Sequence, residues 1–217
     1  LSRPLGDSNR KGINNVKGML DKLITAREII FEELYRRFPN YANLVHAQVP
    51  SLADVQSRLK PDEVIISICS AENSTYVFVV SQSGPPEMVS VPITKKNLEN
   101  LVSELKKSLS PMSDRLGQLP AYDFEKAYEL YSLLLKPVEA AWKNSKHMIL
   151  TTSGPLGQLP FAIITTGPFH LQKDKDVLFS NYRDAPWLIK KIPINTVPSA
   201  SSFVALRAMP GMVGAKE

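Results

Sequence analysis

The most constraining feature of this chain is the segment at residues 146–161, which reads KHMILTTSGPLGQLPF. Met148, Ile149 and Leu150 form a short apolar run without polar alternation, which is typical of a strand buried on both faces. Polar residues end the run abruptly, and a Gly-Pro turn follows. We predict that this run is the central strand of a sheet, and that the apolar triplet 159–161 folds back under it.

Three segments upstream are rich in β-branched residues and are joined by the short turn sequences AENS and QSGPP. They span residues 64–69, 75–81 and 88–91. Because their connections are short, they predict an antiparallel meander of three strands. Two segments near the end of the chain, 187–190 and 192–197, are also expected to be extended.

Helical periodicity is clearest near the start of the chain. Apolar residues recur there at spacings of three and four, which predicts one long amphipathic helix over residues 16–38. Its apolar positions are Met19, Leu20, Leu23, Ile24, Ile30, Phe31, Leu34 and Phe38. Further helices are expected at 51–59, 94–109, 123–135 and 199–206. The two middle helices lead into the strand at 148–150, which gives the strand–helix–strand order of a crossover unit.

These elements predict an α/β fold, in which helices flank a mixed β-sheet. We expect three regions along the chain. Residues 1–48 form an amino-terminal helical arm, which we interpret as the end of a helical repeat array or as a linker helix. Residues 49–209 form the domain, and residues 210–217 form a flexible end.

Three blocks occur in an order and spacing that resemble a known family. They read DEVIISICSAENSTYVFVVSQSG at 62–84, HMILTTSGPLGQLPFA at 147–162, and YRDAPWLIKKIPINTVPSASSFVALR at 182–207. Together they are similar to the front half of a CHAT domain, a caspase-like module often attached to tetratricopeptide repeats. The resemblance covers roughly residues 50–207 and implies a caspase-like half-domain. The family usually carries an acidic residue before Gly-Pro-Leu, where this chain has Ser153.

The resemblance also implies which catalytic residues to look for. In CHAT proteases the histidine lies in a His-Gly pair at the end of an apolar strand, and the cysteine lies in a later Ser-Ala-Cys type block. His46, His147 and His170 are followed by Ala, Met and Leu, and the cysteine block is absent. Both catalytic residues would therefore lie beyond Glu217. The chain resembles the amino-terminal, non-catalytic half, which packs on the protease half and regulates it.

Two alternatives stay open. Cys69 is the single cysteine and ends a predicted strand, so the chain would be a cysteine peptidase in its own right if Cys69 were a nucleophile. The apolar neighbours Val64, Ile66 and Ile68 favour packing of the thiol as a small hydrophobic group instead. The other alternative is a stand-alone protein-interaction module.

Other chemistries find no support in the sequence. Ser153 and Ser199 lack the flanking glycines of a nucleophile elbow, and Ser199 is better interpreted as a helix cap. Asp174 and Asp176 alternate with lysines, which is typical of a solvated loop. We predict no catalytic, cofactor-binding or metal-binding residues in this chain.

The distribution of charge bears on partners. The net charge is +5, but residues 1–61 hold 10 basic and 6 acidic residues, while 62–217 hold 16 and 15. Without a basic block or interleaved exposed aromatic residues, nucleic acid is not an expected partner. No apolar run approaches the 18 or more residues of a membrane span, so we expect no membrane partner and a soluble, cytoplasmic protein. The expected partners are proteins: the protease half, helical repeats or another regulatory protein.

Overall fold

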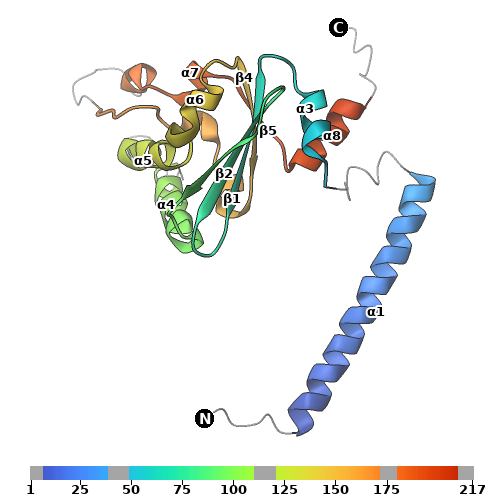
Figure 1. Ribbon diagram of the computed structural model, residues 1–217. Coiled ribbons are helices and arrows are strands. Elements are labelled where there is room, and N and C mark those ends of the chain that lie inside the picture. The colour runs from blue at the N-terminus through green and yellow to red at the C-terminus, as the bar shows by residue number, and fades with distance from the viewer. Residues whose placement is uncertain (1–6, 39–48, 110–120, 172–179, 210–217) are drawn as a thin grey trace. The chain divides into compact units, whose positions relative to one another are not determined.

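The computed structural model describes residues 7–38, 49–109, 121–171 and 180–209 (Figure 1). By its internal contacts the chain divides into two units, Leu1–Gln48 and Val49–Glu217. The first unit contains helix α1, Asp7–Arg37. This helix begins nine residues before the predicted start, and it ends just ahead of Pro39, as predicted.

The second unit is built on a five-stranded mixed sheet with the order β3-β2-β1-β4-β5. Its strands are β1 Glu63–Ser70, β2 Thr75–Ser81, β3 Glu87–Val91, β4 His147–Thr152 and β5 Ile194–Thr196. The pairings β1–β2 and β2–β3 are antiparallel, so the predicted meander is confirmed. The pairings β1–β4 and β4–β5 are parallel, as a crossover connection requires.

The predicted position of strand 148–150 needs a correction. Met148, Ile149 and Leu150 are buried on both faces of the sheet, as their apolar run indicates. However, β1 occupies the middle of the sheet, and β4 lies between β1 and the edge strand β5. An apolar run without alternation indicates a strand that is buried on both faces. Any internal strand of the sheet can be buried in this way, so the run does not identify the middle strand.

The first face of the sheet carries most of the helices (Figure 1). They are α4 Lys95–Lys107, α5 Phe124–Leu134, η2 Lys136–Val138, α6 Glu139–Trp142, η3 Gly154–Gln158, η4 Phe161–Ile163 and α7 Leu188–Lys191. The hydroxyl of Thr94 and the carboxylate of Asp123 accept hydrogen bonds from the first turns of α4 and α5. These caps satisfy backbone donors that have no partner within the helix.

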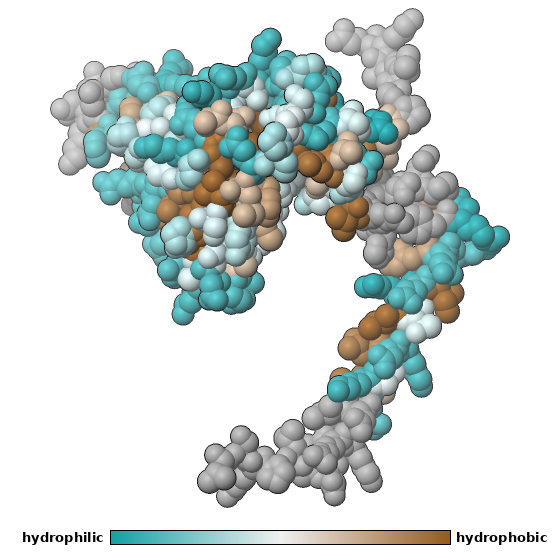
Figure 2. Space-filling model, in the orientation of Figure 1, coloured by the Kyte–Doolittle hydropathy of each residue, from teal (hydrophilic) through white to brown (hydrophobic). Residues whose placement is uncertain are grey.

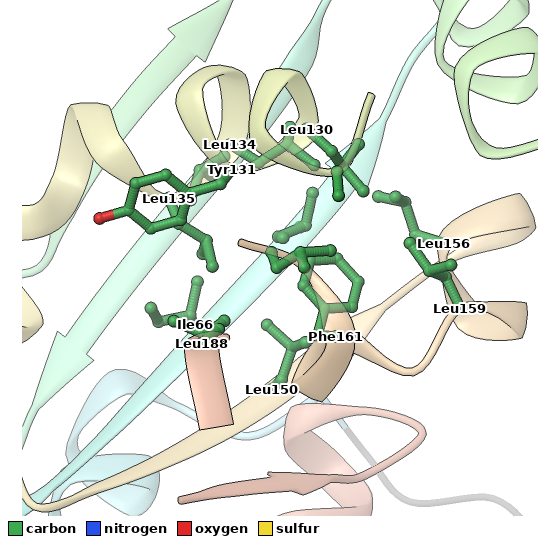
Figure 3. Close-up of a cluster of buried hydrophobic side chains, with 14 of the residues drawn as sticks. Ile66, Leu130, Tyr131, Leu134, Leu135, Leu150, Leu156, Leu159, Phe161 and Leu188 are labelled. Carbon is green, nitrogen blue, oxygen red and sulfur yellow. The ribbon is translucent and has the colours of Figure 1, made fainter. Parts of the chain in front are cut away.

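These helices and the sheet enclose the larger hydrophobic core (Figure 3). Ile66 of β1 and Leu150 of β4 lie opposite each other in the register and are both fully buried. Leu156 and Phe161, which follow β4, are buried in the same core. The segment after the Gly-Pro turn therefore folds back under the sheet, as predicted.

The second face is covered by two short helices, α3 Leu52–Arg58 and α8 Ala200–Ala208 (Figure 1). Their buried side chains form a separate, smaller cluster with the sheet. Its members are Val55, Leu59, Ile65, Ile149 and Phe203.

One predicted extended segment is helical in the structure. Residues 188–191 form α7, and only Ile194–Thr196 of the second segment pair as a strand. The backbone of Leu188 donates to Ile164 and accepts from Ile192, which closes a single turn and buries the Leu188 side chain. A segment of four residues is too short for its apolar pattern to distinguish a turn of helix from a strand.

Candidate functional site

Cys69 lies near the carboxyl end of β1, and its side chain is exposed. The interpretation that it packs as a small hydrophobic group is therefore wrong. Side chains alternate along a strand, so the buried neighbours Ile66 and Ile68 point to the larger core, while Cys69 points to the second face. That face is covered by α3 and α8 only around Ile65 and Ile149.

The second face continues beyond these helices as a partly open surface. The register aligns Cys69 with Tyr76 and Ser90, and it aligns Ser67 with Phe78 and Met88. Phe78 is 37% exposed and Met88 is 57% exposed. Cys69 therefore sits on an apolar and hydroxyl-bearing sheet surface.

Among the described residues, His147 does not form a dyad with Cys69. His147 is the first residue of β4 and pairs in register with Glu63, six residues before Cys69. At about 3.3 Å per residue, that separation along the parallel strands is roughly 20 Å. His170 is exposed and follows Phe169, which packs against the larger core. His46 lies outside the described residues.

The turn after β4 has a structural explanation. Gly154 has a φ of 62°, a left-handed conformation that favours glycine, and it opens η3. Before the turn, the Thr151 hydroxyl donates to the Ser67 hydroxyl at 2.8 Å, which satisfies the hydrogen-bonding group of a buried threonine between β4 and β1.

Ser199 caps α8 by accepting from the backbone of Ser202 at 3.0 Å, as predicted.

Aromatic residues form a cluster at the end of the larger core. The Tyr122 hydroxyl donates to the Ile163 carbonyl at 2.7 Å, and the Tyr122 amide donates to the Tyr182 hydroxyl at 3.1 Å. The ring centroids of Tyr122 and Phe124 lie 5.0 Å apart, and those of Tyr122 and Trp187 lie 5.3 Å apart. Burial raises the pKa of Tyr122, and the nearby Asp123 carboxylate adds to the shift. The cluster joins the start of α5 to η4 and to residues 182–187, and Trp187 takes part in it as a packing residue.

Two surfaces are suited to binding other proteins. The first is the apolar stripe of α1, formed by Val16, Met19, Leu20, Leu23, Ile24, Ile30 and Phe38, which are between 41% and 68% exposed. Figure 2 shows hydrophobic patches beside hydrophilic side chains on the visible face of this helix. A shallow groove at its carboxyl end is lined by Ile30, Leu34 and Phe38. Arg27 lies within the stripe, 6.0 Å from the centre of the Phe31 ring.

The second surface is the edge of β5. The Met148 amide donates to the Pro193 carbonyl at 2.9 Å, and the Val197 amide donates to the Leu150 carbonyl at 3.0 Å. Backbone groups alternate in direction along a strand, so the amide and carbonyl groups of Ile194 and Thr196 point away from β4. Such an edge is a template for pairing with another strand.

Neither metal chemistry nor a membrane span is indicated within the described parts of the chain. No group of three or more His, Cys, Asp or Glu side chains converges there on a possible metal position. Asp174 and Asp176 lie outside that part of the structure. Among the same residues, no helix is both long enough and apolar enough to cross a membrane.

Comparisons with known proteins were made at the level of sequence families, individual proteins and folds. The chain matches no protein-family model, no curated protein and no solved structure.

Proposed function

We propose that this chain is the non-catalytic, amino-terminal scaffold half of a caspase-like cysteine endopeptidase of the CHAT type. It packs on a protease half that follows Glu217 and regulates it. In this proposal the protein acts in the cytoplasm, and its partners are the protease half and a helical protein or repeat array bound through α1. The resemblance of the three sequence blocks is the starting point for the proposal.

The observation that carries the proposal is the open edge of β5. The sheet ends in a strand of three residues whose Ile194 and Thr196 backbone groups point outward. A protease half that adds a strand there would continue the sheet, and the main-chain hydrogen bonds would supply affinity. The separation of Cys69 from His147 in the structure supports a chain that needs a second half for catalysis.

The exposed stripe of α1 supports the second part of the proposal. In proteins, most of the stability of a helix comes from packing of its apolar face against other elements, and little comes from helix propensity alone. The stripe is wider than the two-position seam of a coiled coil, because Ile24 extends it beyond Leu20, Leu23 and Ile30. A stripe of this width fits a surface made of more than one helix.

The test is reconstitution with the polypeptide encoded downstream of Glu217. The two parts should form a one-to-one complex by light scattering, and the complex should cleave peptides. Thr196→Pro should abolish or greatly weaken the complex, because it removes an outward backbone donor while leaving the pairing with β4 intact. Thr196→Val keeps that donor and is the matched control.

The outcomes separate the alternatives. Peptide cleavage by the chain alone that is lost in Cys69→Ala would replace the proposal with a cysteine peptidase. Failure to bind the downstream polypeptide, with α1 still binding another protein, would favour a stand-alone interaction module.

A further inference from the structure

The first and the last described helices of the second unit, α3 and α8, lie together on the second face of the sheet. Helix α3 begins four residues after Gln48, the end of the first unit, and α8 is the last helix described. Figure 1 shows α3 and α8 packed side by side, apart from the helices of the other face. The two helices are separated by more than 140 residues of sequence but share one small cluster.

That cluster is separate from the larger core. Val55 and Leu59 come from α3 and the residue after it, Phe203 comes from α8, and Ile65 and Ile149 belong to the sheet. Each helix buries its apolar face partly against the other, so neither is fully covered if the other leaves. Segments with few buried apolar contacts open at lower free energy than the main core.

A single carboxylate joins the two helices. Glu63 Oε2 accepts from the Lys60 amide at 3.0 Å, just after α3, and Glu63 Oε1 accepts from Arg207 Nη2 of α8 at 2.6 Å. The Glu63 side chain is 7% exposed and that of Arg207 is 33% exposed. The Arg207 guanidinium also lies 5.3 Å from the centre of the Phe203 ring.

We propose that α3 and α8 form one cooperative unit that opens from the sheet together, held closed by Phe203 and by the Glu63 carboxylate. A change at α3 then reaches α8 through this shared cluster while the larger core stays closed. The coupling is a property of the domain alone. Its use to relay a signal to a following protease half rests on the proposed function.

Backbone amide exchange measured by NMR on the full chain tests the coupling. The probes are the amides of Val55, Leu59 and Phe203, whose hydrogen bonds lie in or next to the two helices, with Met148 as the sheet reference. In the unmodified chain the three helix probes should exchange by one opening step and faster than Met148. Phe203→Ala should speed exchange at Val55 and Leu59 by roughly a hundredfold, because truncating a buried Phe leaves a cavity.

The reciprocal change uses α3. Val55→Ala should speed exchange at Phe203 while leaving Met148 unchanged. Leu206→Ala is the matched control, because Leu206 is on α8 but 50% exposed, and it should leave α3 unchanged. If Phe203→Ala unfolds the whole chain, Val55→Ala and Glu63→Gln provide the same readout with smaller perturbations.

Two results would overturn the coupling. One is faster amide exchange in the substituted helix alone. The other is exchange of the helix amides at the same rate as Met148, which would mean that they open only when the whole domain unfolds. Neither result depends on whether a protease half binds the β5 edge. Conversely, a failed reconstitution would leave the exchange result standing.

Discussion

Arg207 Nη2 lies 2.6 Å from Glu63 Oε1, which joins the last turn of α8 to the first residue of β1 across 144 residues of sequence. Burial raises the pKa of Glu63, but the hydrogen bonds from the Lys60 amide and from Arg207 outweigh burial, and the net pKa lies below its ordinary value of 4.5. The carboxylate is therefore bound in its charged form. This contact depends on the chain coming back, after β5, to the place where β1 begins.

The first prediction concerns acid stability. Because the pKa of Glu63 is lowered on folding, its contribution to the free energy of unfolding is present above its unfolded pKa and is lost as pH falls through the folded value. Glu63→Gln should remove this contribution at pH 7. Denaturant midpoints of the two proteins should differ at pH 7 and converge only when the pH falls below the lowered pKa of Glu63 in the folded state. An equal difference at every pH would contradict the assignment.

The second prediction ranks two buried isoleucines. Ile66 lies on the middle strand and points into the larger core, whereas Ile149 points into the smaller cluster. Both alanine variants should lose about 2 to 5 kcal/mol of unfolding free energy, with Ile66→Ala the more costly because its densely packed site cannot collapse. Lys96→Ala, an exposed position on α4, is the control and should stay within about 0.5 kcal/mol. Chemical unfolding curves would measure all three, and a larger loss in Ile149→Ala would reverse the ranking.

The third prediction concerns Tyr122. Tyr122→Phe removes the hydroxyl and leaves the Ile163 carbonyl without this hydrogen bond. The free energy of unfolding should therefore fall by about 1 to 3 kcal/mol. The raised pKa also means that the folded state resists ionisation of Tyr122. Stability should therefore fall as pH rises above about 10, where tyrosines of the unfolded chain ionise.

Tyrosinate absorbance and circular dichroism, followed together through this alkaline range, would check the prediction. We expect the last tyrosines to ionise only as the fold is lost. In Tyr122→Phe, the alkaline transition should involve one late-ionising group fewer. Complete ionisation of all tyrosines in a fully folded protein would contradict the burial of Tyr122.

The fourth prediction concerns Cys69. Its exposed thiol should be alkylated by iodoacetamide in the native state, adding a single group by mass spectrometry. Cys69→Ser should change the unfolding free energy by no more than about 0.5 kcal/mol, because the side chain is not part of either core cluster. Labelling that requires denaturant would show that the thiol is buried.

The fifth prediction concerns the arm. All residues of the two described core clusters lie after Val49. A chain lacking residues 1–45 should therefore keep the denaturant midpoint of the domain while losing any association that depends on α1. In the full chain, Leu23→Glu should disrupt that association, and Lys22→Glu on the polar face is the control. Cooperative unfolding of the shortened chain would place α1 in the core instead.

Much of the local structure follows from the sequence, because the signals there are local. The β-branched runs 64–69 and 75–81, joined by a short turn, could pair only as neighbours, and the structure has them antiparallel. Thr94, Asp123 and Ser199 cap helices because each precedes an apolar helical pattern with a side chain that can accept a backbone hydrogen bond. The apolar run 148–150 indicated burial on both faces, and its residues are buried.

What only the tertiary structure decided depends on where distant segments meet. The position of β4 in the strand order depends on β5 pairing with its outer edge, and that pairing joins residues more than 40 positions apart. Cys69 is exposed because α3 and α8 stop short of its end of the sheet, although its local sequence is that of a buried strand. The ion pair between Glu63 and Arg207 could not be predicted from the sequence. It spans 144 residues and forms only when α8 packs next to the start of β1. Periodicity and capping act over a few residues, whereas strand order, coverage of a face and long-range ion pairs depend on packing of the whole domain.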